Sequence, residues 1–106
     1  MSIVYSDNFI DKVEFPHEEY TLSSLFYECY GLYSVHNLIL PATTLTARCY
    51  YCLFSCCENL INSPKLPATI LAEGCYMEMF YWCYALANAP ELPATELSAY
   101  CYSCMF

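Results

Sequence analysis

Apolar side chains recur along this chain with a short period of four residues. Within residues 66–91 the apolar positions that follow this spacing are Leu71, Cys75, Met79 and Cys83. Such spacing favours one face of a helix. The residues after it, 86–92, are interrupted by proline, which cannot donate to a central strand ladder, so we expect a short extended segment there. The pattern predicts a unit made of a helix-like turn and a short extended segment.

A second period of 26 residues is carried by the tetrapeptide Leu-Pro-Ala-Thr, which begins at Leu40, Leu66 and Leu92. A weaker copy precedes the first of these. Aligned on the tetrapeptide, further columns match: Leu45, Leu71 and Leu97; Cys49, Cys75 and Cys101; Tyr50, Tyr76 and Tyr102; Cys57 and Cys83, with Cys29 in the weaker copy. A fixed period of this length indicates stacked units, because one unit cannot bury its apolar face alone.

The two periods together predict one domain of the α/β repeat class. It would be a short leucine-rich-repeat-like solenoid of about three to four units, each a helix-like turn plus a short extended segment. The expected segments are an N-terminal cap or arm at 1–14, built from a strand or a helix, a divergent first repeat at 15–39, full repeats at 40–65 and 66–91, and a partial last repeat at 92–106. The C-terminal end is apolar, so we expect it to pack against a second copy or another protein, or to belong to a longer array.

The repeated pattern L-P-A-T-x-L-x-x-x-C-Y-x-x-(L/M)-F-x-x-C-x-x-L resembles the BspA-like class of leucine-rich repeats, found in surface proteins of gut-associated bacteria and in some of their phages. Residues 40–106 match it closely and residues 15–39 weakly. The resemblance implies a curved solenoid used in adhesion or protein recognition, without catalytic residues. This chain departs from the class in having few repeats and in the less polar turns at 57–59 and 83–85.

Aromatic content changes the picture from fold to function. Of the 106 residues, 58% are hydrophobic and only 13% charged, and the chain holds twelve tyrosines and six phenylalanines, so some aromatic side chains must face solvent or a partner. Large amphipathic rings are enriched at interface hot spots. We therefore predict a non-enzymatic protein–protein interaction module whose contact residues are Tyr51, Tyr81, Trp82, Tyr84 and Tyr100. The alternative for Tyr50, Tyr76 and Tyr102 is packing within their own column.

The net charge of −8 has two interpretations. The first is ordinary solubility, because a chain this apolar needs like charge to stay dispersed. The second is a small acidic phage-type inhibitor, in which Glu18 and Glu19 help to block a basic nucleic-acid-binding surface of a host protein. Direct binding to nucleic acid is disfavoured, because the chain has only three basic residues, Lys12, Arg48 and Lys65.

The nine cysteines allow a metal or redox hypothesis. Two C-x-x-C pairs, Cys49/Cys52 and Cys101/Cys104, are an alternative zinc or redox site. The distance between the pairs is much longer than the usual ~15–20 residues, and the repeat columns already account for most cysteines as a ladder of buried thiols. The expected structural ladder is Cys29, Cys49, Cys57, Cys75, Cys83 and Cys101, which leaves Cys52, Cys56 and Cys104 outside the columns. No cofactor is expected.

Enzyme and membrane motifs are weak in this sequence. His17 and His36 stand in unrelated contexts, and no glycine-rich phosphate loop occurs, so catalysis is not expected. No apolar stretch approaches the ~20 residues of a membrane helix. The acidic N-terminus lacks the basic and apolar regions of a secretory signal. The expected location is the cytoplasm if the chain is full length, and the cell surface or a virion if it is a fragment.

Overall fold

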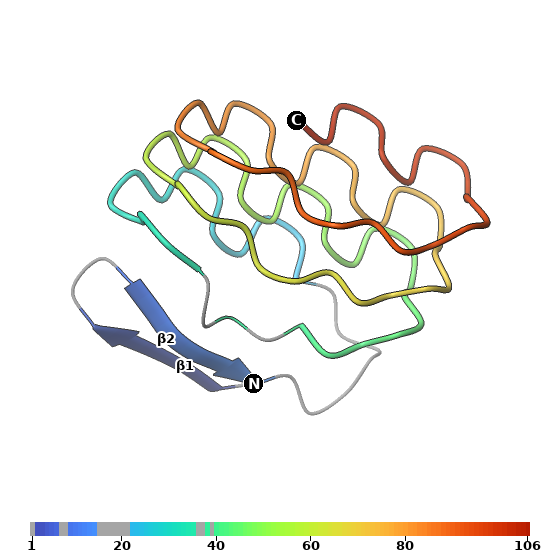
Figure 1. The fold of residues 1–106 in the computed structure, drawn as a ribbon, viewed down its shortest axis with the longest axis horizontal. Helices are drawn as coiled ribbons and strands as arrows, with labels where there is room; N and C mark the ends of the chain where they lie inside the picture. The colour runs from blue at the N-terminus through green and yellow to red at the C-terminus, as the bar shows by residue number, and fades with distance from the viewer. Residues whose placement is uncertain (1, 7–8, 15–21, 36–37, 39) are drawn as a thin grey trace.

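An antiparallel hairpin of two strands, β1 (Ser2–Ser6) and β2 (Phe9–Glu14), begins the chain. The structure, a computed structural model, describes residues 2–6, 9–14, 22–35, 38 and 40–106. Ile3 pairs with Val13, and the register shifts by an irregularity between β1 residues Val4 and Tyr5. Figure 1 shows this hairpin in blue. For the segment where the sequence allowed a strand or a helix, the observed elements are therefore strands.

Beyond the hairpin, the described residues contain no helix and no further named strand. They form four runs of consecutive turns, which we call the first to fourth turn runs: 23–28, 47–56, 73–82 and 99–104. The predicted α/β solenoid with helix-like turns is therefore wrong. The physical reason lies in the four-residue spacing, because positions four apart drift by about 40° per step around a helix of 3.6 residues per turn. A chain of four-residue turns keeps them in line without drift.

Backbone N–H groups in each of the first three runs alternate between two kinds of acceptor. The N–H of Leu53 donates to the carbonyl of Tyr50, three residues back in the same run, at 3.2 Å. The next N–H, of Phe54, donates to the carbonyl of Met79 in the following run, at 2.9 Å. Phe80 repeats this bond to Met105 at 2.8 Å. Each run is therefore both a series of turns and one layer of a stack, which Figure 1 shows as neighbouring zigzag traces.

A left-handed residue recurs at every fourth position of the runs. These residues have φ between 49° and 62°: Ser24 and Glu28; Arg48, Cys52 and Cys56; Gly74, Glu78 and Trp82; Tyr100 and Cys104. A left-handed residue among right-handed ones reverses the curl of the backbone, so the run advances as a zigzag instead of winding into a helix. The same positions recur from run to run, so that the side chains of neighbouring runs lie in columns.

Extended segments connect the end of one run to the start of the next along the opposite side of the molecule (Figure 1). They contact each other through a few parallel backbone bonds. Thr44 and Ile70 form an isolated parallel bridge, and the N–H of Leu45 donates to the carbonyl of Ile70 at 2.9 Å. Further along, the N–H of Ala87 donates to the carbonyl of Ile61 at 3.0 Å. The connecting segments therefore follow the stacking of the runs.

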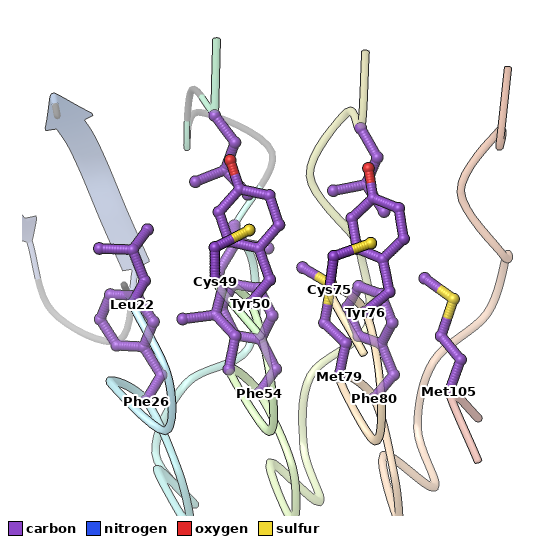
Figure 2. Close-up of a cluster of buried hydrophobic side chains, with 14 of the residues drawn as sticks. Leu22, Phe26, Cys49, Tyr50, Phe54, Cys75, Tyr76, Met79, Phe80 and Met105 are labelled. Carbon is purple, nitrogen blue, oxygen red and sulfur yellow. The ribbon is translucent and has the colours of Figure 1, made fainter. Parts of the chain in front are cut away.

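The core lies between the turn runs and the extended segments, and its aromatic rings stand in columns. Phe26, Phe54, Phe80 and Phe106 stack with ring centroids 5.5, 5.6 and 5.8 Å apart in successive pairs. Tyr50, Tyr76 and Tyr102 form a second column with spacings of 5.9 Å. Figure 2 shows Phe54 beside Phe80 and Tyr50 beside Tyr76, on neighbouring runs. The column packing considered for these tyrosines is present, because the runs place equivalent residues side by side.

Candidate functional site

A shallow groove crosses the first three turn runs on the face of the stack. We call it the aromatic groove; its volume is about 440 Å³, and its lining residues are Ser24, Tyr27, Tyr51, Cys52, Ser55, Cys56, Glu78, Tyr81 and Trp82. Several of these residues, among them Cys52, Glu78 and Trp82, are left-handed residues of the runs. The turn geometry therefore brings to one surface side chains that lie far apart in the sequence.

The groove is hollow because one column alternates large and small side chains. Tyr27, Ser55 and Tyr81 occupy equivalent places in the first, second and third runs. The central serine is buried and leaves a gap between the two tyrosines, and its hydroxyl donates to the carbonyl of Tyr81 at 3.4 Å. Tyr81 stacks on Trp82 with ring centroids 5.2 Å apart, while Trp82 stays 50% exposed. The groove thus has an aromatic wall that is both ordered and accessible.

A thiol and a carboxylate meet in the groove. Cys52 lies on the second run, and its thiol donates to the Glu78 carboxylate on the third run at 3.3 Å. Burial raises the pKa of the Cys52 thiol to about 11, so the sulfur stays protonated at neutral pH. A protonated thiol is a weak nucleophile and a weak metal ligand. The arrangement therefore suits hydrogen bonding better than thiolate chemistry.

The groove carries negative charge without a countercharge in the described part of the chain. The Glu78 carboxylate accepts from the Cys52 thiol and is also hydrogen-bonded to the Tyr51 side chain, and neither Arg48 nor Lys65 forms an ion pair with it. The pKa of Tyr51 is raised to about 12, first by its hydrogen bond to Cys52 and its electrostatic interaction with that thiol, and then by the charge of Glu78 and a hydrogen bond to it. The pKa of Tyr27 is raised as well, first by the charge of Glu28 and by a hydrogen bond to it.

The structure places the predicted contact residues in three different settings. Tyr51, Tyr81 and Trp82 line the aromatic groove together. Tyr84 is 70% exposed and lines a second hollow of about 450 Å³ with Phe80, Trp82, Cys83, Leu86, Ala89 and Phe106. Tyr100 is 68% exposed and lines neither hollow. Glu18 and Glu19 lie outside the described residues.

Sequence reasoning missed part of the groove. Tyr27 and Ser55 were not singled out, although the Tyr27–Ser55–Tyr81 column is visible once the runs are aligned. Glu78 was not singled out either, because a helix would place it off the face that carries Leu71, Cys75 and Met79. Glu78 is a left-handed residue of its run, and because most such residues here are not glycine, the sequence does not reveal these positions.

Cysteines of the repeat columns lie in or against the core. Cys49, Cys75 and Cys101 are buried at equivalent places in successive runs. The thiol of Cys57 donates to the carbonyl of Phe26 at 3.0 Å, and that of Cys83 donates to the carbonyl of Phe54 at 3.0 Å. The thiols of Cys57 and Cys83 therefore each form a hydrogen bond to the backbone of the preceding unit. Cys29, in the first unit, is half-buried.

The two C-x-x-C pairs do not converge. Cys49 and Cys101 lie in the buried column, Cys52 lies in the groove and Cys104 is exposed on the fourth run. No group of three or more histidine, cysteine, aspartate or glutamate side chains suited to a metal ion occurs among the described residues. All nine cysteines are free thiols, and burial raises the pKa of Cys49 to about 11. The residues of the zinc or redox alternative are thus not assembled into one ligand set.

Comparisons with known proteins add no relative to this description. No family model, no curated protein and no solved structure matches the chain. In the described residues no helix is both long and apolar enough to cross a bilayer. The aromatic groove is therefore the feature of this chain that bears most directly on its function.

Proposed function

We propose that this chain is a non-catalytic protein-binding module that takes a segment of a partner protein into the aromatic groove. One observation carries the proposal: the groove exposes a stacked Tyr81–Trp82 pair next to the buried thiols and serine of the second run. Rigid, partly exposed aromatic rings supply large contact area at low entropic cost, which is why they dominate interface hot spots. The resemblance to BspA-like repeats implies the same class of function.

The shape of the groove favours a polypeptide over a compact small ligand. It is open along the stack, since its lining comes from three successive runs of the chain. A small-molecule pocket instead encloses most of its ligand's surface. An extended segment that lies across the runs can insert one side chain at the gap above Ser55 and rest its backbone against the flanking tyrosines.

Removal of the Trp82 side chain from the aromatic groove tests this function. We expect Trp82→Ala to weaken capture of a native partner by roughly 30-fold or more, the loss typical of a hot-spot aromatic. The measurement is a quantitative pulldown from the native host, followed by titration of the captured protein with purified variants. Tyr100→Ala is the matched control, because Tyr100 is exposed but lines neither hollow.

Tyr84→Ala, measured beside these variants, separates the aromatic groove from the second hollow. Capture that depends on Trp82 and not on Tyr84 or Tyr100 supports the groove. Equal capture of the same partner by the wild type and all three variants would rule the aromatic groove out as the binding site.

A further inference from the structure

We propose that the aromatic groove recognises a basic side chain of the partner segment, an arginine above all, through Glu78 and the Tyr81–Trp82 pair. This inference rests on the proposed function and names the chemistry of the residue that enters the gap. The groove holds a carboxylate without a countercharge, an aromatic surface of the kind that binds cations next to it, and a hollow from which both are reached at once.

The Glu78 carboxylate gives the groove a negative charge. Glu78 is held by the neutral Cys52 thiol and the neutral Tyr51 side chain, which orient the carboxylate without neutralising it. The raised pKa values of Tyr27 and Tyr51 both have neighbouring acidic side chains among their causes. The chain as a whole carries a net charge of −8. A half-buried carboxylate in a negative field binds a cation more strongly than a neutral or acidic group, because partial exclusion of water weakens dielectric screening.

The stacked rings of Tyr81 and Trp82 favour a planar cation over a compact one. The faces of tryptophan and tyrosine attract cations within about 6 Å of the ring centroid. The stacked Tyr81–Trp82 pair lines the same hollow as Glu78, and Trp82 is half exposed. A guanidinium is planar, stacks on rings and offers several N–H donors to one carboxylate, so it uses both features together. A lysine ammonium uses the charge but stacks less well.

The chain provides a direct optical probe of this site. Trp82 is its single tryptophan and lines both the groove and the second hollow, so its fluorescence reports on binding at either, and the Glu78 variant assigns the signal to the groove. The probes are three five-residue peptides that differ only at the central position, acetyl-Gly-Ser-X-Ser-Gly-amide with X as arginine, lysine or citrulline. Citrulline keeps the size of arginine and removes its charge. The protein is titrated with each peptide at low and at physiological salt, under reducing conditions.

We expect the arginine peptide to bind about five- to tenfold more tightly than the citrulline peptide, as a charge-assisted contact supported by a ring requires. Glu78→Gln should lower arginine affinity to the citrulline level. Glutamine tolerates the backbone as glutamate does, and its amide oxygen still accepts from Cys52. Glu73→Gln is the control, because Glu73 is an exposed carboxylate of the same unit that does not line the groove. It should leave arginine binding unchanged.

Four results would overturn the inference. Equal affinity for the arginine and citrulline peptides would remove the charge argument, and an equal loss in Glu73→Gln would show that only net charge matters. Dimers that form without peptide and dissociate in Glu78→Gln would assign the groove to a second copy of this chain. If no peptide binds but Trp82→Ala still abolishes partner capture, the arginine inference fails while the protein-binding function stands.

Discussion

At the residue scale, Tyr76 shows that the columns are kept at some cost. Its ring stacks between those of Tyr50 and Tyr102, and Figure 2 shows it beside the ring of Tyr50. The hydroxyl is buried and has no hydrogen-bond partner in the described part of the chain. Burial raises the pKa of Tyr76 well above its ordinary value, so the group stays neutral. Stacking of equivalent residues has therefore outweighed the loss of one hydrogen bond.

We expect Tyr76→Phe to stabilise the fold by about 1 kcal/mol, because it removes a buried polar atom that has lost its bond to water. The measurement is equilibrium urea unfolding followed by circular dichroism. Tyr102→Phe serves as the control; Tyr102 lies in the same column but is only half-buried, so its unfolding free energy should hardly change. A clear loss of stability in Tyr76→Phe would mean that the hydroxyl has a partner.

At the element scale, the turn run requires a left-handed residue at every fourth position, whatever the side chain. Nine of these ten residues are not glycine, although left-handed backbone is unfavourable for side chains with a Cβ atom. The stack repays this strain with one inter-run hydrogen bond at alternate residues, as at Cys52, whose N–H donates to Met77 at 3.0 Å. Gly74 is the exception at φ 62°, and a Cβ atom there would lie 3.2 Å from Cγ of Arg48.

Gly74→Ala should therefore destabilise the protein by about 1–2 kcal/mol, since it adds both left-handed strain and a tight contact. Thermal and urea unfolding of the purified variant measure this loss. Gly31→Ala is the matched control, because Gly31 does not have a left-handed φ and is exposed. Similar losses in the two variants would contradict the role given to the left-handed positions.

At the scale of the whole molecule, the fourth run leaves one side of the stack uncovered. The N–H groups of Tyr100, Tyr102 and Cys104 have no backbone acceptor among the described residues, whereas the equivalent Tyr76 and Glu78 donate to the fourth run. Phe106 is 56% exposed and Leu97 is 64% exposed, although their column neighbours Phe80 and Leu71 are buried and half-buried, respectively. This surface has the composition of a core and the open donors of a sheet edge.

We propose that this edge drives self-association as the protein concentration rises. Phe106→Asp should weaken association about tenfold or more, because burial of one phenylalanine contributes roughly 1.5–3 kcal/mol. Sedimentation velocity across a concentration series gives the association constant. Tyr30→Asp is the control, an exposed aromatic near the first run. A wild-type protein that stays monomeric throughout the series would refute the proposal.

The repeat spacing predicted which residues become neighbours. Tyr50, Tyr76 and Tyr102 stack as their 26-residue spacing suggested, and the column cysteines Cys49 and Cys75 are buried side chains of equivalent runs. The prediction of a helix-like turn was wrong because apolar residues four positions apart are compatible both with one face of a helix and with a series of turns. Periodicity of side chains cannot distinguish the two, since the difference lies in where alternate N–H groups find their acceptors.

The groove was predictable only in part, for the same reason. Tyr51, Tyr81 and Trp82 were predicted as contact residues because the chain has more aromatic side chains than its core needs. Nothing in the sequence around Ser55 or Glu78 indicates that these two residues share a surface with the three aromatic ones. The sequence by itself determined the columns, because residues at one repeat spacing come side by side when the units stack. The tertiary structure alone decided which face each column presents. That choice depends on left-handed residues, and the stack sustains them through hydrogen bonds between runs that no single run contains.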